Sequence, residues 1–390
     1  MHFRFVPAFA AAVLAACTLA SPAIERTSPP ATATSLTRAS TEVLFWDDAT
    51  RADRFRHMED LFPGIEVAPS PHPRTLPAGA ALPATASGAL DTYLARGDIA
   101  GIMVLQGGKV RYEKYGLGFG PEQRWTSFSM AKSLTSTLAG AAMKDSYIRS
   151  LDDKVSQYVP GLAGSAYDDV TLEQLLTMTS GVAWNEDYAD PNSDVARIFA
   201  VEPDPGQSQV VTVMKKLPRE APPGEKWVYK TGETNLVGEL VEKATGRTLA
   251  EYAKQKVVDP AGLAGKLFWQ TELTGGNVGG CCIELSMRDY ARFGQFVLEG
   301  GHGSVASDWL GRAGAPHVDL GQGFGYGYQW WTYPAGAFGA VGIFGQSITL
   351  FPDEEFVVVI LGNWPKATGA DLTGPRTALL AQVHAALAAE

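Results

Sequence analysis

Short runs of apolar residues, bounded by Gly, Pro and Asp, recur near both ends of the chain and predict antiparallel strands. Near the start, two such runs at 100–105 and 110–115 flank Gly107 and Gly108, and these glycines permit the positive φ angles of a tight hairpin. Near the end, four more strands are predicted, at 325–331, 338–343, 347–351 and 356–361. A final helix is predicted at 375–389, where an apolar stripe recurs at helical spacing.

Helical periodicity and Gly/Pro loops dominate the region between the two strand-rich ends. The pattern predicts an α/β (α+β) fold in which both chain ends build one antiparallel sheet, helices flank it and a mainly helical domain is inserted. The predicted sheet domain comprises 85–125 and 322–390, and the predicted helical domain comprises 126–321. A cleft is expected where the two domains meet.

The composition limits the classes of function. Among 390 residues, 42 acidic side chains outnumber 32 basic ones and give a net charge of −10, which argues against a nucleic-acid partner. Hydrophobic residues make up 45% and charged residues 19%, so the chain can bury a large core and does not have the composition of a disordered protein.

The first 17 residues resemble a lipoprotein-type signal peptide. An apolar run from Phe5 to Ala16 is short for a membrane span, and its Leu-Ala-Ala-Cys ending, at Cys17, resembles the bacterial lipoprotein box. Simple cleavage after a small residue such as Ala23 is the alternative. Either way an exported, periplasmic protein is expected, with lipid on Cys17 as its only membrane contact in the first case.

Residues 18–84 are expected to connect this anchor to the body. The Pro/Ala/Thr/Ser-rich stretch from 18 to about 41 has the composition of a flexible tether. The aromatic-rich stretch 44–62 predicts a helix that packs on the main body.

Ser129 and Lys132 are the first candidate catalytic pair. They stand three residues apart at the start of a predicted helix, so their side chains share one face, and Lys132 is the only charged residue between Arg124 and Lys144. A lysine in apolar surroundings loses its charge more readily and can take a proton from a serine hydroxyl. The pattern alone fits an N-capping serine and a lysine that lies along a core helix equally well.

Two further features support a catalytic reading. Tyr229 lies on a loop that enters a predicted helix, where a phenol beside a lysine can pass a proton to a leaving group. The strand around Gly339 carries small residues that let a substrate approach the backbone. The Ala340 N–H is therefore expected to act with the Ser129 N–H as an oxyanion hole.

Because it carries these residues in this order, the chain resembles the serine β-lactamase and penicillin-binding superfamily. Within it, the chain resembles the class C-related branch of esterases and 6-aminohexanoate-oligomer hydrolases. The resemblance covers most of residues 44–390. Besides the Ser129–Lys132 motif, four blocks carry it, at 175–181, 229–238, 288–294 and 342–346. It implies a β-lactamase/transpeptidase-like fold and a serine hydrolase that needs no cofactor. In addition, the run 186–191 resembles the aminohexanoate-oligomer hydrolases and implies that Tyr188 contacts the substrate.

The departures from the family pattern concern the substrate. β-Lactamases carry Lys-Thr-Gly or His-x-Gly on the strand beside the serine, whereas this chain carries Ala337, Phe338 and Gly339. Because an apolar pair cannot bind a carboxylate, strong penicillinase activity is not expected. Thr231 replaces the asparagine of the Tyr-x-Asn element, and Phe199 stands where an acidic residue would bind a substrate amine. Thr231, Phe338 and Gly339 are thus predicted, with Tyr188, to contact the substrate.

Other chemistry has weaker support. The six histidines are scattered without a pair at ligand spacing, so no metal site is expected. Cys281 and Cys282 can form an adjacent-residue disulfide, although two small buried side chains are the favoured interpretation. The acidic residues Asp187, Asp190 and Asp194 lack the spacing of an EF-hand, and a solvated loop is expected.

The predicted function is hydrolysis of a small-molecule ester or linear amide through an acyl-enzyme on Ser129, with Lys132 and Tyr229 as the acid/base pair. The alternatives are a true β-lactamase or D-amino-acid peptidase, and a binding lipoprotein that keeps the fold without catalysis.

Overall fold

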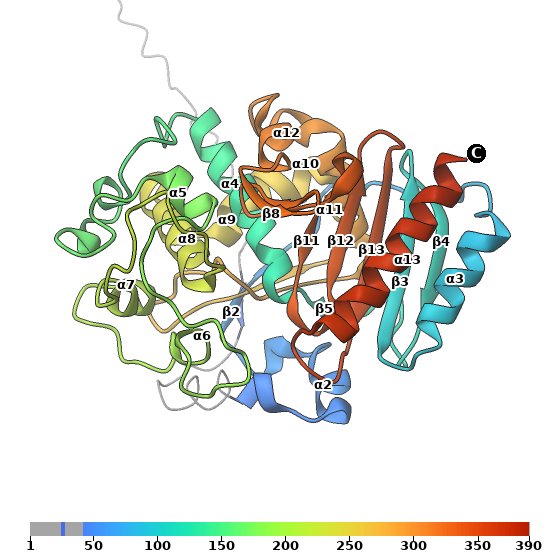
Figure 1. The fold of residues 1–390 in the computed structure, drawn as a ribbon, viewed down its shortest axis with the longest axis horizontal. Coiled ribbons are helices and arrows are strands. Elements are labelled where there is room, and N and C mark those ends of the chain that lie inside the picture. Colours follow the sequence, from blue (N-terminus) through green and yellow to red (C-terminus); the bar gives the residue numbers. More distant parts are fainter. Residues whose placement is uncertain (1–24, 28–41, 390) are drawn as a thin grey trace, which may run out of the picture.

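The structure is a computed structural model that describes residues 25–27 and 42–389. Cys17 lies outside these residues, so its lipidation stays a prediction. Two antiparallel sheets organise the described part of the chain, and helices surround them (Figure 1). No helix in this part is both long and apolar enough to cross a membrane.

The larger sheet has eight strands and confirms the prediction that both chain ends build it. The strands are β3 (Ile99–Gln106), β4 (Lys109–Tyr115), β8 (Val318–Gly321), β9 (Phe324–Tyr326), β10 (Trp331–Thr332), β11 (Phe338–Val341), β12 (Ser347–Phe351) and β13 (Phe356–Gly362). Their order in space is β4-β3-β13-β12-β11-β10-β9-β8. The N-terminal hairpin therefore pairs directly with the last strand of the chain, with Val104 opposite Val358.

The single strand predicted at 325–331 is two strands, β9 and β10. The chain turns between them, where the Gly327 N–H donates to the Trp330 carbonyl at 2.8 Å. Gln329 lies in this turn with a φ of 64°, and its side-chain amide donates to the carbonyls of Leu175 and Leu176. A buried amide satisfied by backbone oxygens thus holds the turn, which strand periodicity cannot reveal.

A second, five-stranded sheet is not predicted from the sequence. Its strands are β1 (Glu25–Thr27), β2 (Gly64–Val67), β5 (Trp125–Thr126), β6 (Leu267–Gln270) and β7 (Ile283–Leu285), in the order β1-β2-β6-β7-β5. Each has only two to four residues, which is too short for alternation to be recognised. This sheet crosses the predicted domain boundaries, because β5 and β7 pair across the segment that contains Ser129.

Helices cover both faces of the larger sheet (Figure 1). On one face, α3 (Ala84–Leu94) packs on β3 and on α13 (Ala370–Ala388). On the other face, α11 (Met287–Leu298) packs on β3, β12 and β13. The predicted C-terminal helix therefore exists and begins at Ala370 instead of residue 375.

Most of the remaining helices lie in the chain between β4 and β8. α4 (Ala131–Lys144) packs against α8 (Thr231–Thr245), which ends at Gly246 in the left-handed conformation, with φ 67°. The others are shorter: α5 (Leu172–Leu176), α6 (Asp194–Arg197), α7 (Gln209–Met214), α9 (Leu249–Ala253), α10 (Asp259–Ala261) and α12 (Trp309–Ala313).

The aromatic-rich stretch 44–62 packs on the body as predicted, although it is not one helix. It contains a 3-10 turn at Val43–Phe45, then α2 (Asp48–Arg54), then a second turn at Met58–Asp60. Asp47 caps α2 by accepting from the Thr50 N–H at 2.8 Å. Phe55 and Phe62 are buried in the core.

Candidate active site

Ser129 lies in a 3-10 turn, Phe128–Met130, that leads directly into α4. Phe128 has a φ of 44°, a left-handed conformation that side-chain-bearing residues rarely adopt. Its surroundings hold it there, because its ring packs on Phe55 and Phe344 with centroids 5.0 and 5.4 Å away. The turn thus fixes the position of Ser129 at the start of the helix.

Lys132 is buried, with 1% of its surface exposed, and its amine contacts three oxygen atoms. The Nζ atom lies 2.9 Å from Ser129 Oγ, 3.0 Å from Thr231 Oγ1 and 2.6 Å from the Gly280 carbonyl oxygen. Burial lowers the pKa of Lys132 to about 7, while the charge of Glu186 opposes this effect. A neutral amine beside the serine hydroxyl is therefore accessible near neutral pH.

Tyr229 faces the same group of side chains. Its ring stacks on Trp331 with centroids 5.5 Å apart, and Lys132 Nζ lies 5.2 Å from the Tyr229 ring centroid. Burial and the Glu186 charge raise the pKa of Tyr229, whereas its hydrogen bond with the Ser129 side chain acts in the opposite direction. The phenol therefore keeps its proton and can donate it.

Glu186 is a site residue that the sequence analysis did not single out. Its carboxylate accepts from the Tyr188 hydroxyl at 2.7 Å, from the Thr231 N–H at 2.9 Å, and from the Thr231 hydroxyl and the Trp184 indole. Glu186 therefore ties Tyr188 to Thr231, and Thr231 in turn contacts Lys132. The only sequence signal was its place at the start of the family-like run 186–191, which also contains Tyr188.

Two cavities meet at Ser129. We call the first the apolar pocket; its wall includes Met58, Phe62, Phe128, Ile198, Phe199 and Ile343. We call the second the Arg376 pocket; its wall includes Glu186, Tyr229, Trp331, Val341, Trp364 and Arg376. Ser129, Tyr188 and Ile343 line both cavities, so the serine hydroxyl lies where a substrate can extend in two directions.

Tyr188 and Thr231 thus lie at the cavities, as expected of substrate-contacting residues, but Phe338 and Gly339 do not. The Phe338 ring is buried against Trp330 at 5.2 Å between centroids, and Gly339 is paired with Trp331 in the sheet. Neither residue lines either pocket. The predicted contact of Phe338 and Gly339 with substrate is therefore corrected: both belong to the packed interior of the sheet.

Ala340 also differs from its predicted place. The Tyr333 N–H donates to the Ala337 carbonyl, and backbone groups alternate in direction along a strand. The Ala340 N–H consequently points toward β12, where Ala340 lies opposite Ile348, and Ala340 lines neither pocket. The backbone that does line the Arg376 pocket beside Ser129 is the following segment, 341–343.

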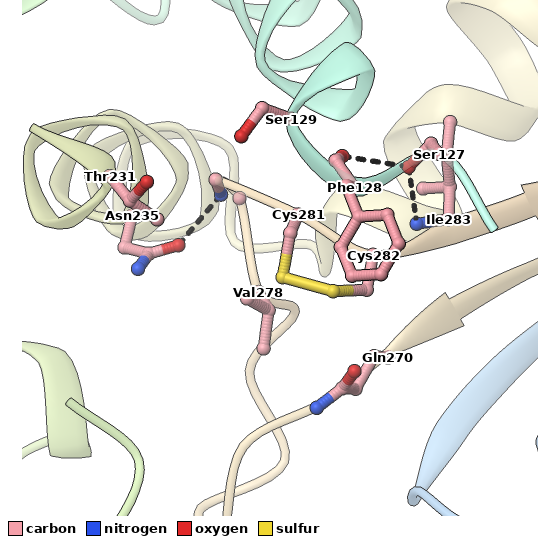
Figure 2. Close-up of a disulfide and its surroundings, with 12 residues drawn as sticks. Ser127, Phe128, Ser129, Thr231, Asn235, Gln270, Val278, Cys281, Cys282 and Ile283 are labelled. Carbon is pink, nitrogen blue, oxygen red and sulfur yellow. Dashed lines mark hydrogen bonds between the residues drawn. A yellow bond between two sulfur atoms is a disulfide. The ribbon is translucent and has the colours of Figure 1, made fainter. Parts of the chain in front are cut away.

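Cys281 and Cys282 form a disulfide, which corrects the favoured interpretation of two separate side chains. The peptide bond between them is cis. Figure 2 shows this disulfide between the turn that carries Ser129 and the strand residue Gln270, and both cysteines line the apolar pocket. Gly280, which directly precedes it, donates its N–H to Asn235 and accepts from Lys132, so the disulfide adjoins the segment that holds the lysine.

The acidic loop is consistent with the interpretation of a solvated loop. The side chains of Asp187 and Asp190 accept from the backbone N–H groups of Ala189 and Asn192, two residues further on in each case. Within residues 25–27 and 42–389, no cluster of His, Cys, Asp and Glu has the arrangement of a metal site.

Comparisons with known proteins agree with this geometry. The family model described as Beta-lactamase matches residues 87–382. A 6-aminohexanoate-dimer hydrolase of Paenarthrobacter ureafaciens is 30% identical over 306 residues, which is 73% of this chain and 78% of that protein. A lovastatin esterase of Penicillium rubens is 28% identical over 187 residues, which is 44% of this chain and 46% of the esterase.

Solved structures share the fold. A putative 6-aminohexanoate-dimer hydrolase from Bacillus anthracis superposes with a TM-score of 0.74 at 20% identity, covering 85% of this chain and 92% of the other. A class C beta-lactamase superposes with a TM-score of 0.59 at 18% identity, covering 77% and 95%. The expected β-lactamase/transpeptidase-like fold is therefore confirmed.

Proposed function

Because the chain belongs to the beta-lactamase family, we propose that it hydrolyses an ester or linear amide bond through an acyl-enzyme on Ser129. The observation that carries this proposal is the 2.9 Å contact between Ser129 Oγ and the buried amine of Lys132. A lysine with a pKa of about 7 can act as a general base at neutral pH, where an ordinary lysine is protonated.

In the acylation step, neutral Lys132 takes the proton of Ser129 as the serine oxygen attacks the carbonyl carbon. The negative charge that develops on the carbonyl oxygen is held by the Ser129 N–H and by the backbone of segment 341–343. Within this segment the Gly342 N–H is already bonded to the Gln346 carbonyl at 2.9 Å. We therefore assign the second donor to Val341 or Ile343 in place of Ala340.

Collapse of this intermediate requires a proton on the leaving oxygen or nitrogen. Tyr229 donates that proton and recovers one from protonated Lys132, so the pair is reset. Water then attacks the acyl-enzyme while neutral Lys132 takes one of its protons. As the intermediate collapses, that proton passes to Ser129 Oγ, directly or by exchange through Tyr229, and the acid product leaves with Ser129 and Lys132 restored. No step requires a cofactor.

The relatives support hydrolysis of ordinary esters and amides, since one is described as an aminohexanoate-dimer hydrolase and another as a lovastatin esterase. The β-lactamase and peptidase alternatives stay open on the same catalytic residues. The non-catalytic alternative is disfavoured, because Ser129, Lys132 and Tyr229 converge around one accessible cavity system.

Three substrates test the proposal: p-nitrophenyl butyrate, a linear aminohexanoate dimer and nitrocefin. We expect the purified protein to hydrolyse at least one of the first two, and S129A to hydrolyse neither. A folded wild-type protein that hydrolyses only nitrocefin would favour the β-lactamase alternative. A folded protein inactive on all three would favour the binding protein.

We also propose that the protein is exported and lipidated on Cys17, on the basis of its lipoprotein-like motif. Fractionation of cells that express the wild type and C17S tests this. The wild type should sediment with membranes and C17S should be soluble, whereas membrane-bound C17S would contradict lipidation at this residue.

A further inference from the structure

The Cys281–Cys282 disulfide forms part of the wall of the apolar pocket, in the same cavity as Ser129. Cys282 is 8% exposed and belongs to the packed interior, whereas Cys281 is half-buried and is the more open of the two side chains. Figure 2 shows the bond between the two sulfur atoms beside the turn that carries Ser129. A covalent bond that a thiol can break therefore lies at the surface that a bound substrate touches.

The backbone around the disulfide is held by hydrogen bonds that do not depend on it. The Gly280 N–H donates to Asn235 Oδ1 at 2.6 Å, and its carbonyl accepts from Lys132 at 2.6 Å. The Cys282 carbonyl accepts from the Gln270 N–H at 3.1 Å. A Cβ atom on Gly280 would lie 2.9 Å from Asn235 Oδ1, so the backbone already touches α8 and has no room to move toward it. We therefore expect the backbone and the Lys132 contact to stay in place when the disulfide is broken.

The two cysteine side chains must respond instead. Sulfur atoms that are no longer bonded lie further apart, because each then keeps its full van der Waals radius. Cys282 is enclosed by packed side chains and has little space in which to move. Cys281 is more open to the pocket, so its Sγ atom is the one that moves, into space that a ligand would otherwise occupy. Reduction thus narrows the apolar pocket and leaves the catalytic groups where they are.

The apolar pocket receives the acyl part of the substrate. Tyr229, the proposed proton donor to the leaving group, lines the Arg376 pocket and not the apolar pocket. The leaving group therefore lies in the Arg376 pocket, and the acyl group extends into the apolar pocket. An acetyl group needs only the space next to Ser129 Oγ, whereas a hexanoyl chain must extend along the wall that includes the disulfide. The two acyl groups should therefore differ in how strongly they depend on this bond.

We propose that the Cys281–Cys282 disulfide determines which acyl groups the enzyme accepts. The oxidised protein accepts a linear aliphatic acyl chain, and reduction by a dithiol excludes this chain while hydrolysis of short acyl groups continues. The lining of the pocket suits such a chain, because it consists largely of aliphatic and aromatic side chains such as Met58, Ile198 and Phe199. The proposal rests on the proposed function.

The reduction step balances with a dithiol as the reductant. One thiolate of the dithiol attacks Cys281 Sγ, the bond to Cys282 breaks, and the Cys282 sulfur takes a proton. The second thiol of the reagent then attacks the mixed disulfide and releases Cys281 as a thiol. Two electrons thus pass from the dithiol, which becomes a cyclic disulfide, to the two cysteines. Disulfides persist outside the cytosol, so an exported protein would carry the oxidised form.

Two esters with the same leaving group test the proposal. We would measure kcat/KM for p-nitrophenyl acetate and p-nitrophenyl hexanoate with full-length C17S, in which Cys281 and Cys282 are the only cysteines. The protein would be assayed as isolated and after treatment with dithiothreitol, with the reagent removed in the absence of air. Reduction should lower kcat/KM for the hexanoate by about 5- to 100-fold, as for an overpacked apolar site, and change the acetate value less than about twofold. Reoxidation should restore the hexanoate value.

The matched control is C281A/C282A in the same C17S background. It removes both sulfur atoms, so the pocket keeps room for the hexanoyl chain and there is no bond to reduce. Its ratio of hexanoate to acetate hydrolysis should therefore be the same before and after dithiothreitol. Because the Lys132 contacts remain, the midpoint of the pH profile for the acetate should also stay unchanged when C17S is reduced. Should C281A/C282A fail to fold, the comparison of oxidised, reduced and reoxidised C17S still decides.

Binding of an acyl-group analogue gives a second readout that needs no turnover. Calorimetry should show that hexanamide binds oxidised C17S more tightly than reduced C17S. Alkylation of free thiols followed by mass spectrometry establishes the redox state of each sample. C17S isolated in air without a reductant should resist alkylation at Cys281 and Cys282, and alkylation of both thiols would overturn the proposal.

The outcomes separate the two proposals. If C17S hydrolyses both esters and reduction changes neither their ratio nor the affinity for hexanamide, the disulfide does not set acyl specificity, while the hydrolase proposal stands. Equal losses on the acetate and the hexanoate would also contradict a role in specificity. If neither ester is hydrolysed but reduction weakens hexanamide binding, the role of the disulfide in the pocket stands and the hydrolase proposal fails for these esters. Absence of both hydrolysis and hexanamide binding would overturn both.

Discussion

The amine of Lys132 lies 2.9 Å from the hydroxyl oxygen of Ser129, inside a site where the lysine is almost completely buried. Two neutral acceptors, Thr231 Oγ1 and the Gly280 carbonyl oxygen, hold the amine in this position. These contacts hold the amine in place, and neither of them is a carboxylate that would stabilise its protonated form. Burial favours the neutral form. This relationship makes several consequences measurable.

The first prediction concerns pH. Because protonated Lys132 cannot accept a proton, kcat/KM for a neutral ester should fall about tenfold per pH unit below a midpoint near 7, the pKa of this lysine, and should level off above it. Stopped-flow or steady-state assays from pH 5 to 9 measure this profile. A profile that is flat through this range would show that Lys132 is not the base.

The charge of Glu186 raises the pKa of Lys132, against the effect of burial. E186Q keeps the size of the side chain and removes the charge, so the midpoint of the pH profile should move to lower pH. A matched control is E202Q, because Glu202 is exposed and lines neither pocket. A midpoint that moves upward, or moves equally in both variants, would refute this electrostatic role.

Thr231 positions the lysine, since its hydroxyl lies 3.0 Å from Lys132 Nζ. T231V retains the shape and loses the hydroxyl, and kcat should fall by about 5- to 100-fold, as expected for one hydrogen bond to a chargeable group. T231S restores the hydroxyl and should recover most of the activity. Equal activity of T231V and T231S would contradict a positioning role.

Tyr229 is expected to matter most for poor leaving groups. Y229F keeps the ring that stacks on Trp331 and removes the proton donor. The loss in kcat/KM should be about 10²- to 10⁴-fold for an alkyl ester or amide. It should be much smaller for p-nitrophenyl butyrate, whose leaving group is stable as an anion. Equal losses on both substrates would indicate that Tyr229 acts in another way.

The convergence of Ser129, Lys132 and Tyr229 on one site could be predicted because its signals are local. Ser129 and Lys132 are three residues apart on one helix turn, and Tyr229 stands in a block that resembles the family. The large sheet was predictable for a similar reason, since β13 is an apolar run and β12 alternates the polar Ser347 and Thr349 with apolar residues, with a turn between the two strands.

The parts that failed depend on contacts between distant segments. Glu186 and Arg376 line the cavity only because the fold brings their loop and helix next to the turn that carries Ser129. No residue spacing in the sequence indicates this proximity. Phe338 and Ala340 lie on the predicted strand. The pairing of this strand with β10 and β12 decides which side chains and which N–H groups point toward the cavity. The disulfide is a different case, because Cys281 and Cys282 are adjacent in the chain and residue types alone do not distinguish a bonded pair from two free thiols.

The central claim is that Ser129 is a nucleophile activated by Lys132. Labelling with a fluorophosphonate probe, followed by peptide mass spectrometry, tests it most directly. The control variant is S133A, whose serine lies one turn further along α4 and bonds to the Gln329 carbonyl instead of Lys132. Wild type and S133A should each carry one label on Ser129, S129A should carry none, and K132R, folded by circular dichroism, should label at least 100-fold more slowly, since arginine cannot act as the base. A label on any other serine, or rapid labelling of folded K132R, would contradict the mechanism.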